Sequence, residues 1–345
     1  MVMNSAPSLP IEAFLELSKT QPIFDVRTPS EFAHAHIPHA RNLALFSDEE
    51  RAIIGTAYKQ ESREKAIMHG FEFFGPKMKS IVEQALANTT GTDVLVHCWR
   101  GGMRSSAVAW LLNFYGLKTH LLEGGYKAFR RYALNSFEIP KPLIILGGKT
   151  GSGKTHILHE IHKLGAQTID LEGIASHKGS AFGALGMPAQ PSQEQFENIL
   201  GVAYREITPE RPLWLEDESR KIGMAMIPEQ LFKSMRSAKT IFIDMPLGLR
   251  VEGLVKDYGT ADREGLRASI LKIKDQLGGD RTQKAIAELE AERLAECFEI
   301  LLSYYDKTYL HGIKKREPNT VFRIEVSTMN AAENARNIVE FASTI

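Results

Sequence analysis

The stretch Val94–Ser106, VLVHCWRGGMRSS, decides the fold of the first half of the chain. Three apolar residues lead to His97 and Cys98, a glycine-rich turn follows, and residues 107–113 continue as a helix. Backbone N–H groups in such a turn, together with the N-terminus of the following helix, favour a thiolate and a bound anion. Because a thiol with a lowered pKa is a nucleophile at neutral pH, we predict that Cys98 is catalytic.

A second strand–loop–helix stretch, Leu143–Thr155, reads LIILGGKTGSGKT and contains a complete phosphate-binding P-loop. Its glycines let the backbone curl around a phosphate group, its lysine spans two phosphate groups, and its threonine could hold Mg²⁺. The predicted diphosphate-binding residues are Gly148, Gly151, Ser152, Gly153, Lys154 and Thr155.

The sequence identifies the phosphate-binding loop but does not identify the phosphate compound that binds there. A nucleotide hydrolase needs a further carboxylate at the end of a neighbouring strand to hold the metal. The candidates are Asp170, Glu216, Asp217 and Glu218. No motif for reading a nucleotide base stands out, so the loop also suits a diphosphate other than that of a nucleotide. No set of side chains has the spacing of a protein-held metal site, and we expect no tightly bound cofactor.

Short apolar strands alternate with helices around both stretches, which predicts an α/β protein with parallel sheets covered on both faces. The predicted strands are 23–26, 94–97, 119–122, 143–146, 168–170, 213–216, 240–244 and 321–326. The predicted helices are 10–17, 30–34, 48–73, 76–87, 154–164 and 330–342, with a charged helical region from 261 to 309. Two prolines within 137–142 indicate a linker, so we expect domains at 1–137 and 138–345.

Composition predicts a cytoplasmic protein without a membrane span. The chain has 345 residues, a formal net charge of zero and two distant cysteines, Cys98 and Cys297, which argues against a disulfide framework. No segment approaches about 20 apolar residues, and Met1–Pro10 lacks the pattern of a secretory signal. We interpret Cys297 as a core residue from its helical spacing with leucines and isoleucine.

The first half resembles rhodanese domains. Asp25–Phe32 and His36–Asn42 match the N-terminal signature of that family, Leu122–Phe129 matches the C-terminal one, and the cysteine loop lies between them. The resemblance implies a rhodanese-like fold over roughly residues 10 to 135 and a cysteine that carries sulfur, or selenium, as a persulfide or its analogue. It also implies that Asp25 and Arg27 hold the fold together and that the nearby histidines are local hydrogen bonders.

The cysteine loop departs from the common sulfurtransferase form by one additional residue. Five residues separate Cys98 from Arg104, a spacing that also resembles the signature of cysteine-dependent phosphatases. A wider loop should hold a larger anion such as phosphate or selenophosphate, and Arg104 could grip its oxygens with its planar fork. The predicted anion-binding loop comprises Trp99, Arg100, Gly101, Gly102 and Met103.

From Phe14 to its last residue the chain is similar to the tRNA 2-selenouridine synthases, which join such a rhodanese domain to a P-loop domain. Asn42–Arg51 and Gly148–Thr155 also fit that family. The similarity implies a transferase that replaces the sulfur of wobble 2-thiouridine in tRNA by selenium from selenophosphate. It further implies an S-geranyl intermediate made from geranyl diphosphate, with selenophosphate synthase as a candidate partner.

Two other function classes remain open from the sequence. One is a general sulfurtransferase or cysteine phosphatase with a regulatory nucleotide-binding domain. The other is a nucleotide-dependent RNA-binding protein whose rhodanese domain is only structural. Because the chain has no net charge, an RNA partner requires local basic patches. The candidate patches are Lys127, Arg130 and Arg131 beside Tyr126, Phe129 and Tyr132; Arg263, Arg267, Lys272, Lys274, Arg281 and Lys284; and Lys314–Arg316.

Overall fold

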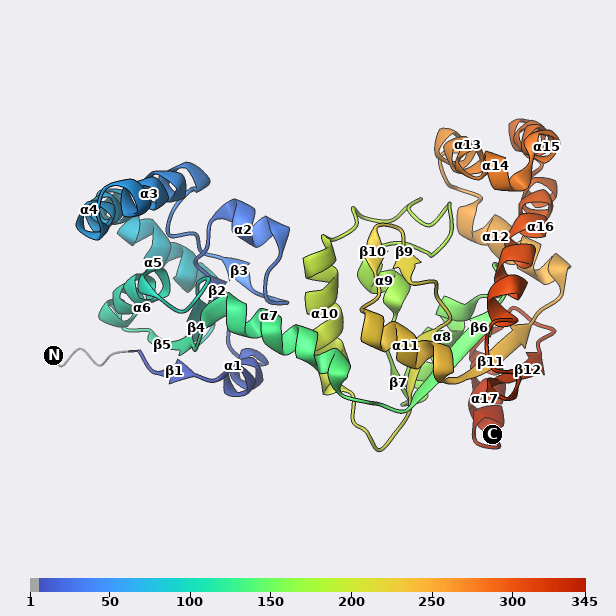
Figure 1. The fold of residues 1–345 in the computed structure, drawn as a ribbon, viewed down its shortest axis with the longest axis horizontal. Helices are drawn as coiled ribbons and strands as arrows, with labels where there is room; N and C mark the ends of the chain where they lie inside the picture. The colour runs from blue at the N-terminus through green and yellow to red at the C-terminus, as the bar shows by residue number, and fades with distance from the viewer. Residues whose placement is uncertain (1–5) are drawn as a thin grey trace. The chain divides into compact units, whose positions relative to one another are not determined.

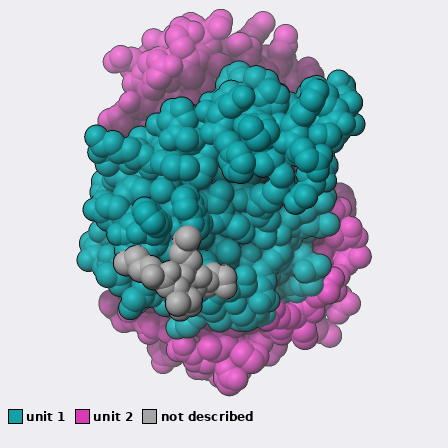
Figure 2. Space-filling model, turned by 90° about the vertical axis from the view of Figure 1, so that its left-hand side faces the viewer, with its two compact units in different colours: residues 1–136 teal, residues 137–345 magenta. Residues whose placement is uncertain are grey.

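The computed structural model describes residues 6–345, and the chain forms two compact units, residues 1–136 and 137–345 (Figure 2). The boundary between the units in the sequence, 136/137, falls one residue before the expected 137/138 boundary. Residues 1–5, part of the segment considered above for a secretory signal, lie outside the described residues. Within residues 6–345, every helix is too short or too polar to cross a membrane.

The first unit contains a five-stranded parallel sheet in the order β1-β5-β4-β2-β3 (Figure 1). Its strands are β1 (Ser8–Leu9), β2 (Ile23–Asp25), β3 (Arg41–Asn42), β4 (Asp93–His97) and β5 (Lys118–Leu122). Its helices are α1 (Ile11–Ser18), α2 (Pro29–His34), α3 (Asp48–Gln60), α4 (Arg63–Phe74), α5 (Met78–Ala87), α6 (Met103–Tyr115) and α7 (Gly125–Asn135). The predicted parallel sheet is confirmed.

The central strand, β4, is buried on both faces of this sheet. Val94, Val96 and Cys98 pack into one core with residues of α5 and α6, whereas Leu95 and His97 alternate toward the other face. On that face the His97 ring contacts Phe14 of α1 and Tyr126 of α7. Because both faces are covered, the strand reads as an unbroken apolar run that ends at the cysteine.

The second unit contains another five-stranded parallel sheet, in the order β12-β11-β6-β8-β7 (Figure 1). Its strands are β6 (Leu143–Gly148), β7 (Gln167–Thr168), β8 (Leu213–Glu216), β11 (Lys239–Asp244) and β12 (Val321–Glu325). A separate antiparallel pair joins β9 (Lys221–Ile222) to β10 (Ala225–Met226).

Helices cover both faces of the second sheet, and a helical region follows. The covering helices are α8 (Lys154–Lys163) and α17 (Ala331–Ala342) on one face and α9 (Leu171–Ala175), α10 (Gln193–Glu206) and α11 (Glu229–Ser237) on the other. The helical region comprises α12 (Leu247–Tyr258), α13 (Arg263–Lys272), α14 (Lys274–Leu277), α15 (Gly279–Glu290) and α16 (Leu294–Ile313). Its own core includes Cys297, which is buried as predicted.

Two sequence expectations about local structure were wrong. The segment 48–73 forms two helices rather than one: the first ends at Gln60 with Glu61 as its C-cap, and Ser62 accepts a hydrogen bond from the Lys65 amide as the N-cap of the second. The predicted strand 168–170 stops at Thr168, and Asp170 instead caps α9 by accepting the Gly173 amide. Short polar side chains that bond to the backbone compete with regular structure at both points.

Candidate active sites

Cys98 lies at the carboxyl end of β4, directly before the loop that leads into α6. Its sulfur accepts a hydrogen bond from the Gly102 amide at 3.3 Å and lies 3.2 Å from the Ser105 hydroxyl. Burial opposes ionisation of this thiol, but the Ser105 hydroxyl and backbone amides of the loop outweigh it and lower the pKa of Cys98. The predicted nucleophile therefore has the electrostatic surroundings that its role requires.

The loop around the sulfur is exposed at its rim and fixed at its base. Trp99 and Met103 are 38% and 59% exposed, and Arg100, Gly101 and Gly102 are exposed as well, whereas Cys98 is buried. The amide of Tyr126, in the first turn of α7, donates to the Cys98 carbonyl at 2.8 Å. A side chain at Gly125 would place its Cβ only 2.4 Å from that carbonyl, so glycine is required there.

Arg104 is bound by a carboxylate of α2 in this structure. Its guanidinium donates to Glu31 at 2.6 and 3.4 Å, and both side chains are partly exposed. Burial opposes ionisation of Glu31, but Arg104 lowers its pKa overall. Arg104 was predicted to bind an oxyanion beside the thiol. To do so, its guanidinium would have to contact the oxyanion in addition to Glu31, or leave Glu31 for it.

Asp25 and Arg27 form the predicted structural ion pair under this loop. Both side chains are fully buried, their closest atoms are 2.6 Å apart, and Arg27 also donates to the Ala35 carbonyl. The guanidinium lies 3.8 Å from the centre of the Tyr126 ring, which ties the pair to α7. Burial lowers the pKa of His97, whose Nε2 lies 3.6 Å from the Asp25 carboxylate rather than facing the sulfur.

The P-loop follows the central strand of the second sheet in the same way. Gly148 ends β6, Gly151 and Ser152 lie in the turn, Gly153 precedes α8, and Lys154 and Thr155 form the first turn of that helix. Gly151 has a φ of 83°, and a Cβ there would lie 2.8 Å from the Arg250 carbonyl. The Lys154 ammonium donates to the Gly148 carbonyl at 3.1 Å. The predicted diphosphate-binding residues are thus adjacent.

Three carboxylates crowd the start of α8. The Thr155 hydroxyl lies 2.6 Å from Glu216 and 3.0 Å from Glu172. Burial and the neighbouring Glu172 raise the pKa of Glu216 to about 8, and burial together with these carboxylates raises the pKa of Glu218 well above its usual value. Of the acidic residues predicted from sequence, Glu216 therefore reaches the loop, Glu218 belongs to the same cluster, and Asp170 serves as a helix cap.

Sequence reasoning missed most of the groups that support the P-loop. Glu172 comes from α9, and Tyr309 of α16 accepts the Gly148 amide at 2.8 Å and donates to Asp217 at 2.8 Å. Arg250 of α12 is buried, donates to the Thr150 carbonyl at 3.1 Å and pairs with Asp306 at 2.7 Å. These residues follow no local motif, although one of their partners, Asp217, was an acidic candidate from the sequence.

Comparisons with known proteins cover both units. Residues 11–132 match the model of the rhodanese-like domain, and residues 141–337 match that of the tRNA 2-selenouridine synthase AAA domain. A tRNA 2-selenouridine synthase of Nitrosomonas europaea is 33% identical, over 88% of this chain and 91% of the relative. A tRNA 2-selenouridine synthase of Bdellovibrio bacteriovorus is 36% identical, over 88% of this chain and 91% of the relative. The chain belongs to the tRNA 2-selenouridine synthase family.

A solved structure is also similar to part of the chain. It is the N-terminal domain of a putative ATP/GTP binding protein from Clostridium difficile 630, which is 38% identical and has a TM-score of 0.34. The similar region covers 37% of this chain and 98% of the chain in that structure. In this chain, the regions that match the two family models, residues 11–132 and 141–337, contain the Cys98 loop and the P-loop respectively.

Proposed function

We propose that this chain replaces the sulfur of wobble 2-thiouridine in tRNA by selenium, with selenophosphate as the donor and an S-geranyl intermediate made from geranyl diphosphate. As a member of the tRNA 2-selenouridine synthase family, it is a tRNA-modifying enzyme that transfers selenium. We expect the reaction to take place in the cytoplasm and selenophosphate synthase to supply the donor. The observation that supports the proposal best is the joint presence of an activated thiol and a P-loop in one chain.

The first step requires a site for the diphosphate of the prenyl donor, and the P-loop suits it. The thiouridine sulfur attacks the allylic carbon, the bond from that carbon to oxygen breaks, and diphosphate leaves with the bonding electrons. Lys154 and the loop amides would bind the leaving diphosphate, and positive charge on it lowers the barrier. The resulting S-alkyl group is a better leaving group than a bare thiocarbonyl.

Mg²⁺ fits the oxygen atoms beside the P-loop. Within residues 6–345 no three His, Cys, Asp or Glu side chains are arranged to hold a metal by themselves. Thr155 and Glu216 offer hard oxygen ligands, and the buried Glu216 Oε2 has no hydrogen-bond partner among the described residues. Mg²⁺ commonly uses one or two carboxylates together with substrate phosphates, so these two residues would hold it. Such an ion would neutralise charge on the diphosphate.

The second step assigns the selenium chemistry to Cys98. Its lowered pKa makes a thiolate available, and selenophosphate would bind at the exposed rim formed by residues 99–103. We assign the sulfur the role of a nucleophile that assists displacement: selenium from selenophosphate bonds to C2 of the uridine, geranyl thiolate leaves from that carbon, and the phosphoryl group passes to water as phosphate. The other role, in which Cys98 carries selenium as a persulfide analogue, is not proposed, because the selenium of selenophosphate is at the selenide level and that step needs a two-electron oxidant. Arg104, released from Glu31, would bind the phosphate oxygens of the donor.

The test is mass spectrometry of wobble nucleosides after incubation of the purified chain with 2-thiouridine tRNA, selenophosphate and geranyl diphosphate. We expect S-geranyl-2-thiouridine when selenophosphate is omitted and 2-selenouridine when all components are present. An unchanged nucleoside in the complete mixture would contradict the proposal. Activity on thiosulfate or an aryl phosphate would then favour the sulfurtransferase or phosphatase class.

A further inference from the structure

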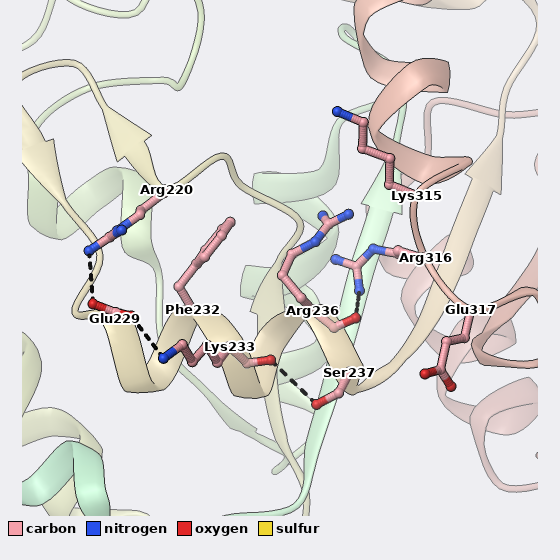
Figure 3. Close-up of a pocket in the computed structure, with 9 residues that line it drawn as sticks. All are labelled: Arg220, Glu229, Phe232, Lys233, Arg236, Ser237, Lys315, Arg316 and Glu317. Carbon is pink, nitrogen blue, oxygen red and sulfur yellow. Dashed lines mark hydrogen bonds and ion pairs between the residues drawn. The ribbon is translucent and has the colours of Figure 1, made fainter.

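A basic cavity lies in the second unit, away from the residues assigned to either step. Its volume is about 480 Å³, and five cationic side chains and two carboxylates are among the groups that line it (Figure 3). The lining residues are Arg220, Glu229, Phe232, Lys233, Arg236, Ser237, Lys315, Arg316 and Glu317. They come from α11, from the segment before β9 and from the chain after α16.

The positive charge of the cavity is only partly balanced. Glu229 is shared between Arg220 at 3.6 Å and Lys233 at 2.8 Å. Likewise Asp217, behind the wall, is shared between Arg316 and Arg236, the latter at 3.5 Å. Burial and the adjacent Arg316 guanidinium lower the pKa of Arg236. An anion in the cavity would relieve this repulsion.

Lys315 and the partly exposed Arg236 can reach such an anion, and the buried Arg316 beside them lacks one acceptor. Lys315 is exposed and has no ion pair within residues 6–345. Arg316 is 5% exposed, and its buried Nε has no hydrogen-bond partner among the described residues. A buried donor without a partner is costly, so the cavity wall is short of an acceptor.

An aromatic ring stands beside these cations. Phe232 and Arg236 are four residues apart on α11 and project from the same side of the helix (Figure 3). Phe232 packs against the core of the unit while remaining partly exposed, so the ring is held in place. Cations that bind phosphates next to a fixed aromatic ring are the combination by which proteins bind single-stranded nucleic acid.

The cavity is also connected to the P-loop by hydrogen bonds. Arg316 and Arg236 contact one carboxylate oxygen of Asp217, the Tyr309 hydroxyl donates to the other, and the Gly148 amide donates to Tyr309. Since all of these residues belong to one compact unit, a ligand of the cavity would be held on the same body as the P-loop.

We propose that this cavity binds the phosphodiester backbone of the substrate tRNA and stacks one unpaired base against Phe232. The proposal rests on the proposed function for the identity of the RNA. Lys315 and Arg236 bind the phosphate oxygens, and Arg220 and Lys233 extend the positive surface along the strand. A free diphosphate is the competing ligand of the same chemistry.

The test measures the affinity of the full chain for labelled 2-thiouridine tRNA across a series of salt concentrations. Lys315→Ala should weaken binding severalfold and lower the slope of log affinity against log salt by about one. Lys314→Ala removes the same charge from the neighbouring exposed residue, which does not line the cavity, and serves as the matched control. Equal losses in the two variants would overturn the cavity assignment.

A second variant tests the stacking contact. Phe232→Leu keeps an apolar side chain against the core but removes the ring, and we expect about a fivefold or greater loss of tRNA affinity with an unchanged salt slope. Phe232→Tyr should restore binding. Wild-type affinity in the leucine variant would contradict stacking at this residue.

Two further measurements separate the alternatives. The first measures pyrophosphate binding in a Lys154→Ala background, where the P-loop no longer binds it. If Lys315→Ala abolishes tight binding of pyrophosphate but leaves the affinity for tRNA unchanged, the ligand of the cavity is a free diphosphate and the proposal is overturned. Because binding is measured without turnover, a chain that binds tRNA through the cavity but forms no selenouridine would support the cavity and contradict the proposed function.

Discussion

The Cys98 loop and the P-loop have the same position in two sheets but opposite surroundings. Each follows the central strand of a five-stranded parallel sheet and leads into a helix. At Cys98, a hydroxyl and backbone amides lower the pKa of the thiol. At the P-loop, Glu216 and Glu218 have raised pKa values, because both are buried and both lie close to the Glu172 carboxylate.

The difference indicates that the Cys98 site is preorganised for its thiolate, whereas the P-loop site requires a bound ligand to balance its charges. Hydrogen-bond donors already surround the sulfur, so the thiolate is favoured without a ligand. The P-loop combines Lys154 with several carboxylates that repel one another, and such a group of acids is stabilised when a cation arrives. Substitutions should therefore affect the chemistry of the first site and both the binding and the stability of the second.

The largest expected effect is the loss of selenium transfer in Cys98→Ser. A hydroxyl cannot replace the thiolate as nucleophile at neutral pH, so we expect no detectable 2-selenouridine and normal S-geranyl-2-thiouridine by nucleoside mass spectrometry. Cys297→Ser is the matched control, since that thiol is buried in the helical core and should leave both products. If the Cys98 variant still forms 2-selenouridine, the Cys98 sulfur has no role in selenium transfer.

The next effect separates the P-loop from the thiol. Lys154→Ala should slow geranyl transfer by about 10²-fold or more, because the leaving diphosphate loses a positive charge that stabilises it. Lys149→Ala, in the same loop, is the control: its ammonium lies 3.7 Å from Asp244, and its removal should have a much smaller effect. Selenation of tRNA that already carries the S-geranyl group should survive both changes, and its loss in Lys154→Ala would make the two sites interdependent.

The sequence predicted the two loops well and their supports poorly. The P-loop and the Cys98 loop are continuous in sequence, and the Asp25–Arg27 pair spans two residues, so local pattern suffices for all three. Tyr309, by contrast, reaches Gly148 from 161 residues away, and Glu31 reaches Arg104 from 73. Such contacts depend on how helices pack against a sheet, and that packing has no signature in the local order of residues.

A smaller effect tests why the thiol is activated. Ser105→Ala removes the hydroxyl 3.2 Å from the sulfur, so the pKa of Cys98 should rise by up to about one unit. In a Cys297→Ser background, the rate of thiol alkylation by iodoacetamide should then fall severalfold near pH 7, and its rise should shift to higher pH. Ser106→Ala changes the adjacent exposed serine and should leave the profile in place. Identical profiles for both variants would assign the activation to the backbone amides alone.

The smallest expected effect concerns the carboxylates of the P-loop. The pKa of Glu216 is about 8 in the folded chain against an ordinary value of 4.5, so between these values the folded state holds a proton that the unfolded state has lost. The free energy of unfolding therefore falls as pH rises through this window, and the cost is fully present above about pH 8. Glu216→Gln stays neutral, so its Tm should match that of the wild type near pH 5. At pH 8.5 its Tm should exceed the wild-type value by about 2–4 °C for each kcal/mol of strain removed. Glu252→Gln, at an exposed position of the same unit, should show no such gap. A gap that is equally large at pH 5 would mean that the glutamine stabilises the fold through its own contacts rather than by removing the charge of Glu216.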